Sequence, residues 1–203
     1  EDYKSILNLI FRNLFFVILI SLFLIIFKEQ IFSLCLFFFD LSKETERNFK
    51  VYFDIRIYSS IFELTIYIII GLFIGLQKTK ISSLAIGSLS ILNILISTIL
   101  VLEYDLNIKG VAYGTLLATF ATSLIFLTYS FHFLKRYTEI NLNIKEILNI
   151  SKIKSLIEIN LNIFLRTILL TFSFFWFTYL SSKIGEEYIA ANTILIKDRK
   201  STR

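Results

Sequence analysis

The chain has 203 residues, of which 56% are hydrophobic and only 18% are charged, and its formal net charge is +5. A soluble domain has about 25% charged residues, so this composition excludes a soluble globular domain, a disordered chain and a disulfide scaffold. An integral membrane protein remains. With one Cys and one His we expect no metal centre. We also expect no nucleic-acid partner, because the basic residues are scattered between apolar runs.

Five apolar stretches are each long enough to cross a bilayer as a helix, since a span needs about 20 residues at about 1.5 Å each. Barrel strands would be about ten residues long and would alternate in polarity, which these stretches do not do. The sequence therefore predicts an all-α, polytopic transmembrane helix bundle. In chain order the predicted spans cover residues 9–27, 55–76, 81–102, 110–134 and 160–181.

The connections between the spans differ in charge. Lys4, Arg12, the turn at 77–80 and the segment 135–159 bring basic residues to every second connection. Because Lys and Arg gather on the cytoplasmic side of membrane proteins, we expect the N-terminal end and these two connections to be cytoplasmic. The segment 40–54 is predicted to be a polar connection on the other side. The segment 135–159 could form an amphipathic helix on the membrane surface.

The second predicted span has one polar or small face. Its members recur at steps of three and four residues, so they share a face that we expect to point into protein. They are Arg56, Ser59, Ser60, Glu63, Tyr67, Gly71 and Gly75. Glu63 would lie about 12 Å inside the outer boundary, where a carboxylate must be paired, protonated or hydrated. Two interpretations stay open: a proton or cation site, or a structural group that pairs with Arg56 or bonds to a Ser.

The remaining spans carry fewer polar groups. Asn93 lies in the middle of the third span and is expected to bond across to another helix, more than to a ligand. Arg166 lies about 9 Å from the cytoplasmic end of the fifth span and can reach the interface. Small residues predict close helix packing at Gly71, Gly75, Gly87, Gly110, Gly114 and Ala118. No catalytic triad, phosphate loop or metal-ligand spacing occurs, so an enzyme is not expected.

Several short motifs, in order, resemble those of one family of transporters. The motifs are Ile55–Ser59, Gly71–Lys80, Leu92–Ile94, Gly110–Thr115, Ile163–Thr167 and Ala190–Leu195. Together they resemble helices three to seven of the multidrug and toxic compound extrusion (MATE) family, in its DinF-like branch. The sequence departs from the family pattern at Ile61 and Ser82, where the family usually has Pro. It also departs at Ser97, where an acid is frequent, and at Glu63, where a small neutral residue is usual.

The resemblance implies a piece of a twelve-helix transporter with two lobes. Residues 1–134 would be four helices of the N-terminal lobe, 135–159 the cytoplasmic linker between the lobes, and 160–196 the start of the C-terminal lobe. The chain has no Met and begins at Glu1, so we expect a fragment whose remaining helices are missing. Residues 197–203 are expected to be an artefactual tail.

The resemblance also implies an activity. The whole protein would export organic, often cationic, drugs or toxic metabolites across a bacterial inner membrane in exchange for H⁺ or Na⁺. Its partners would be the lipid bilayer and a small-molecule solute, and it would need no cofactor beyond the coupling ion. The candidate cavity residues are Glu63, Arg56, Tyr67, Asn93, Arg166 and Asn192.

Two other functions stay open. A flippase for lipid-linked cell-wall or polysaccharide precursors would use a related fold, with a more cationic cavity for pyrophosphate. A non-transporting membrane scaffold subunit would use the small-residue faces only for packing, and Glu63→Gln would then be silent in any transport assay.

Overall fold

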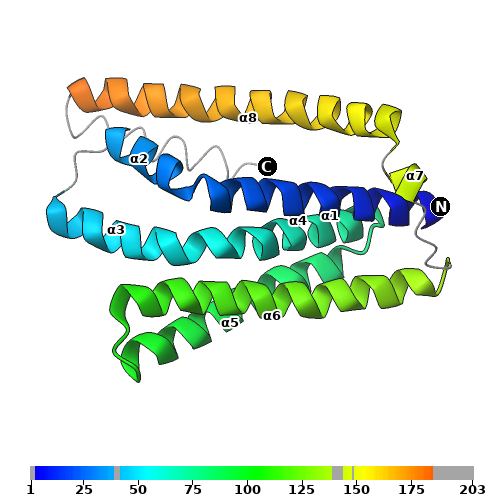
Figure 1. The fold of residues 1–203 in the computed structure, drawn as a ribbon, viewed down its shortest axis with the longest axis horizontal. Helices are drawn as coiled ribbons and strands as arrows, with labels where there is room; N and C mark the ends of the chain where they lie inside the picture. The colour runs from blue at the N-terminus through cyan, green and yellow to red at the C-terminus, as the bar shows by residue number, and fades with distance from the viewer. Residues whose placement is uncertain (1–2, 39–41, 139–143, 148, 185–203) are drawn as a thin grey trace. The chain divides into compact units, whose positions relative to one another are not determined.

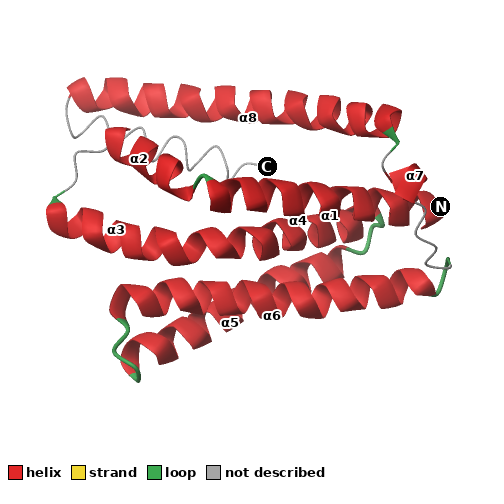
Figure 2. Ribbon diagram, in the orientation of Figure 1, coloured by secondary structure: helices red, strands yellow, loops and turns green. Residues whose placement is uncertain are grey.

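The computed structural model describes residues 3–38, 42–138, 144–147 and 149–184, in which all regular structure is helical (Figures 1 and 2). The chain divides into two units, residues 1–147 and 148–203, which are described separately. In the first unit the helices are α1 (Tyr3–Ile26), α2 (Lys28–Phe38), α3 (Lys43–Arg56), the 3₁₀ turn η1 (Ile57–Ser59), α4 (Ser60–Gly75), α5 (Thr79–Leu102), α6 (Asn107–Lys135) and α7 (Ile144–Ile147). The second unit contains α8 (Ile150–Ile184).

Five helices in the described residues are long and apolar enough to cross a membrane. They are α1, the continuous helix Lys43–Gly75 made of α3, η1 and α4, then α5, α6, and the part of α8 from Ile150 to Phe174. The predicted all-α bundle with five spans is therefore confirmed. Many large apolar side chains on these helices are exposed, as lipid-facing residues of a membrane protein are.

The boundaries of the second span were predicted wrongly. The segment 43–54, expected to be a polar connection, is helical and continues directly into the span. Its start has ordinary helix signals: Ser42 accepts a hydrogen bond from the Thr45 backbone N–H at 3.3 Å, and Glu44 and Glu46 lie in the first turn. This segment is mostly polar or charged, so it lacks the apolar run that indicates a membrane span.

The fifth span also begins earlier than predicted. α8 starts at Ile150, so residues 150–159 of the predicted linker continue into the span and do not form a separate surface helix. Asn149 caps this start, because its Oδ1 accepts from the backbone N–H groups of Ser151 and Lys152 at 3.1 and 3.3 Å. The helix α2 was not predicted at all.

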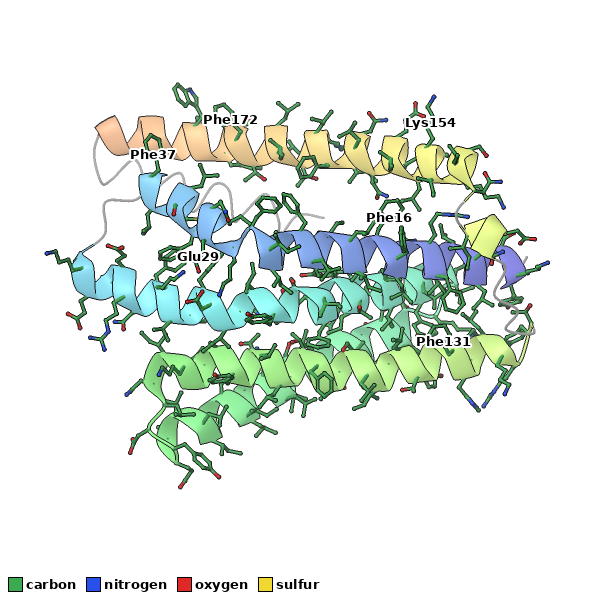
Figure 3. The ribbon with its side chains drawn as sticks, viewed as in Figure 1. Phe16, Glu29, Phe37, Phe131, Lys154 and Phe172 are labelled. Atoms are coloured by element: carbon green, nitrogen blue, oxygen red, sulfur yellow. The ribbon has the colours of Figure 1, made fainter. Side chains whose placement is uncertain are left out.

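The buried core of the first unit lies between α1, α4 and α6. It includes Leu7 and Ile10 of α1, Ile69 and Phe73 of α4, and Phe133 of α6. Ring contacts set the register of these helices. Phe11 stacks on Phe131 at 5.3 Å between centroids, and Tyr3 stacks on Tyr137 at 4.5 Å (Figure 3 labels Phe131). α1 therefore runs antiparallel to α6.

The same ring contacts show that α4 runs parallel to α6. Phe73 contacts Phe133 near the end of both helices, at 5.8 Å between centroids. Phe62, three turns earlier, contacts Phe120 at 5.1 Å. Positions on α4 thus lie level with positions about 58 residues later on α6.

Candidate functional site

A half-buried ion pair lies inside the second span. Arg56 Nη1 donates to Glu63 Oε1 at 2.5 Å and to Ser59 Oγ at 2.5 Å. The Ser59 hydroxyl in turn donates to the Arg56 carbonyl at 2.6 Å. The side chains of Arg56 and Glu63 are 25% and 31% exposed. The carboxylate therefore has its charge partner two turns away on the same helix, as one of the two interpretations expected.

The 3₁₀ turn η1 brings this pair together. It separates Arg56, the last residue of α3, from the first turn of α4, which contains Glu63. Fully buried Ser59 is its last residue. A stretch of 3₁₀ helix inside a longer helix frequently marks a hinge. The pair thus bridges the one interruption in the α-helical geometry of this described span.

The predicted polar face of the span does not all point into protein. Ser59 is buried, but Tyr67 is 66% exposed and Gly71 and Gly75 are exposed. The buried face below the pair is mostly apolar and contains Thr65, Ile66, Ile69 and Phe73. Among the described residues α1 and α6 pack on the apolar face instead, so the expected protein contact of Tyr67, Gly71 and Gly75 stays a prediction.

A second group of charges joins α2 to α3. Lys50 Nζ lies 2.5 Å from Glu29 and 3.4 Å from Asp54, and Lys28 Nζ lies 3.4 Å from Asp54 (Figure 3 labels Glu29). Lys50 also lies 4.6 Å from the centroid of the Phe32 ring. Two cations and two anions compensate each other here, so the group holds the two helices together without net charge.

Asn93 makes the interhelical bond expected of it. Its Nδ2 donates to Thr115 Oγ1 of α6 at 3.2 Å, and its Oδ1 accepts from Ser97 Oγ at 3.1 Å. The Thr115 hydroxyl itself donates to the Val111 carbonyl at 3.0 Å. These three side chains therefore connect the middle of α5 to the first third of α6 through polar groups.

The predicted packing residues differ in their surroundings. A Cβ on Gly114 would lie 2.7 Å from the Ser97 Cα, and one on Gly110 would lie 3.1 Å from the Leu100 carbonyl carbon. Ala118 is fully buried. At Gly71, Gly75 and Gly87 a Cβ would meet no atom of the structure within 4 Å. Close approach of helices is thus seen at the α5–α6 contact, and the other three glycines stay open for a helix outside the described residues.

The remaining candidate residues lie elsewhere. Arg166 is exposed on α8, in the second unit. Asn192 and the expected tail 197–203 lie outside the described residues. Of the six candidate cavity residues, the structure therefore brings Arg56 and Glu63 together. Asn93 is joined to α6, and Tyr67 lies on the exposed side of α4.

Buried Arg12 is a functional candidate that the sequence did not reveal. It is 4% exposed, and its guanidinium donates to the Ile147 carbonyl at 2.8 Å and to the Glu146 carbonyl at 2.9 Å. Asn8 donates to Glu146 Oε2 at 2.8 Å, and Lys4 Nζ lies 3.9 Å from Oε1. One face of α1 thus holds α7. The available sequence signal was the spacing of Lys4, Asn8 and Arg12, which recur every four residues and therefore share one face of the helix.

We expect Arg12→Gln to release α7 from α1. The shorter neutral side chain cannot reach both carbonyls, and charge-assisted bonds of this kind contribute about 1.5–3 kcal/mol. Hydrogen exchange of the backbone amides at 144–147 should rise by about tenfold or more. Asn13→Ala is the control, since among the described residues the Asn13 side chain bonds to the Leu9 carbonyl of its own helix. Unchanged exchange in Arg12→Gln would contradict the contact.

The described helices define the class of the protein as an integral membrane helix bundle. No family model and no solved structure matches the chain. Part of the chain is similar to DNA damage-inducible protein F of Escherichia coli (strain K12), with 28% identity over 145 residues. The match covers 71% of this chain but only 31% of that relative. The chain thus spans about a third of a curated relative, and the match supports the DinF-like resemblance in part.

Proposed function

We propose that the chain is part of a secondary active efflux transporter. The whole protein would export organic, often cationic, compounds across the bacterial inner membrane in exchange for H⁺ or Na⁺. The partial similarity to DNA damage-inducible protein F supports this assignment, as do the five helices able to cross a membrane. The observation that carries the proposal furthest is the Arg56–Glu63 pair across η1 inside one of those helices.

The pair suits a site of proton coupling, because the bond across η1 would differ between ionised and protonated Glu63. With Glu63 ionised, Arg56 binds both the carboxylate and Ser59 and so fixes the geometry around η1. A proton on Glu63 removes its charge and weakens the bond across η1. A ligand or proton shifts a conformational equilibrium only when it binds the two states differently, and this contact supplies such a difference. We propose that proton uptake at Glu63 changes the bend of the helix at η1.

The same charges favour export of solutes over lipid-precursor flipping. A site for pyrophosphate needs an excess of positive charge. In the described part of the second span Arg56 is neutralised by Glu63, which leaves no such excess at this point.

Transport by the full-length protein tests the proposal. Proteoliposomes would be loaded with a fluorescent cationic dye, and a pH or Na⁺ gradient would be imposed across the membrane. We expect dye export to follow the gradient and to stop when ionophores collapse both gradients. Export that continues at the full rate after both gradients are gone would overturn the proposal.

A further inference from the structure

Three buried hydroxyl groups of the first unit stand apart from the others. Ser and Thr side chains inside helices commonly donate to a carbonyl three or four residues earlier. Thr65, Thr119 and Ser130 do so, at 2.7, 2.9 and 2.6 Å. The exceptions among the described residues are the buried hydroxyls of Ser21, Ser60 and Thr122, which have no hydrogen-bond partner.

The register of the helices places these exceptions at one level. Ser21 follows Phe11 by ten residues, about 15 Å along α1. Because Phe11 stacks on Phe131 and α1 runs antiparallel to α6, Ser21 lies level with residues near 121 of α6. That is within one residue of Thr122.

The same level includes the ion pair. The contact of Phe62 with Phe120 places Ser60 and Glu63 level with residues 118 and 121 of α6. η1 and α4 each contact both α1 and α6. Ser21, Ser60 and Thr122 come from three different helices, and all three lie at about the level of Glu63 along the helices. We call these three residues the hydroxyl layer.

Burial limits what can bond to the hydroxyl layer. Ser21 is 1% exposed and Thr122 is fully buried, so an additional helix or a lipid cannot reach their hydroxyls. Ser60 is half-buried as a residue, but its hydroxyl is buried as well. A buried hydroxyl without a partner lowers the stability of the folded state by about 1–3 kcal/mol. Here this penalty would apply to more than one hydroxyl in the same layer. Buried polar groups of this kind are usually satisfied by internal water.

We propose that the hydroxyl layer binds internal water molecules that connect Ser21, Ser60 and Thr122 to the carboxylate of Glu63. Water fits better than a cation because Arg56 already neutralises Glu63, so the layer offers no net negative charge. Water also donates and accepts, as the three hydroxyls do. The core on the C-terminal side of this layer along α4 and α6 is apolar and includes Ile66, Ile69, Phe73 and Phe126. We therefore expect no bound water beyond the layer in that direction.

This site does not rest on the proposed transport function. The water would hydrate the ion pair whatever the protein carries. If Glu63 does exchange protons, the same water gives those protons a hydrogen-bonded contact inside the span.

Radiolytic hydroxyl labelling tests the site in the full-length protein, in nanodiscs and in ¹⁸O-labelled water. Bound water produces radicals that label nearby side chains, and bulk water is kept away by the lipid. We expect label on Phe62, which lies level with the hydroxyl layer, and none on Phe73 of the same helix, which is fully buried in the apolar core. Absence of ¹⁸O label on Phe62 in the wild type would overturn the proposal.

Two matched substitutions on α6 sharpen the test. Val has the shape of Thr but no hydroxyl. Thr122→Val should lower the labelling of Phe62 at least about threefold, because it removes one bonding group of the water. Thr119→Val should leave it unchanged, since Thr119 bonds to the carbonyls of Thr115 and Leu116. Equal labelling in the two variants would contradict the site. If Thr122→Val does not fold, Ser21→Ala should give the same loss of label, and an unchanged label would count against the proposal.

Discussion

Gly114→Ala is expected to force α5 and α6 apart and to destabilise the first unit. The new Cβ would lie 2.7 Å from the Ser97 Cα, which is backbone and cannot rotate away. Overpacking of this kind costs about 1–3 kcal/mol. The move would also stretch the 3.2 Å bond between Asn93 and Thr115. Thermal unfolding in detergent would show the effect as a lower midpoint temperature.

Gly87→Ala is the matched control for this substitution. It makes the same chemical change within a span, at a position where the Cβ would meet no atom within 4 Å. Ala favours the helix over Gly by about 0.8–1.0 kcal/mol, so the midpoint should stay the same or rise. If Gly114→Ala were as stable as Gly87→Ala, the close contact between α5 and α6 would be wrong.

Glu63→Gln is expected to abolish gradient-dependent export while the protein still folds. The amide has nearly the shape of the carboxylate and can still accept a bond from Arg56, but it cannot take up a proton. We expect the pH-driven export rate to fall by about 100-fold, since a positioned acid or base contributes about 10²–10⁴-fold to a step that transfers a proton. The dye-loaded proteoliposomes described above provide the measurement.

Glu29→Gln is the control for Glu63→Gln. It removes the same charge from a carboxylate that is 59% exposed and paired with Lys50 between α2 and α3. We expect export to keep most of its rate, because Glu29 pairs with Lys50, which lies two turns before η1. Full export by Glu63→Gln would leave Glu63 with a structural role alone and would contradict its proposed role in proton coupling.

The membrane spans could be predicted from the sequence because their signal is local. Long apolar runs identify a helix that faces lipid, and the runs 81–102 and 110–134 agree with α5 and α6 to within three residues at each end. The polar helix 43–54 and the short α2 lack this signal. Their stability comes from capping at Ser42 and from contacts such as those of Glu29 with Lys50, which an apolar pattern does not record.

The candidate site could be predicted from the sequence only where its residues are close together in the chain. Arg56 and Glu63 are two turns apart on one helix, so their pairing could be listed as an alternative from spacing alone. The bonds of Arg12 to Glu146 and Ile147 join residues more than 130 positions apart, and no local pattern reveals them. Which side of α4 faces protein was also unpredictable, because it depends on where α1 and α6 pack.

The position of η1 within the long helix Lys43–Gly75 has a mechanical consequence. Beyond η1, α3 extends for 14 residues, about 21 Å at 1.5 Å per residue. A bend of about 10° at η1 would therefore displace the far end of α3 by about 3.5 Å. The Arg56–Glu63 pair bridges the point of bending, so the proposed protonation of Glu63 would move the start of α3, about four turns away.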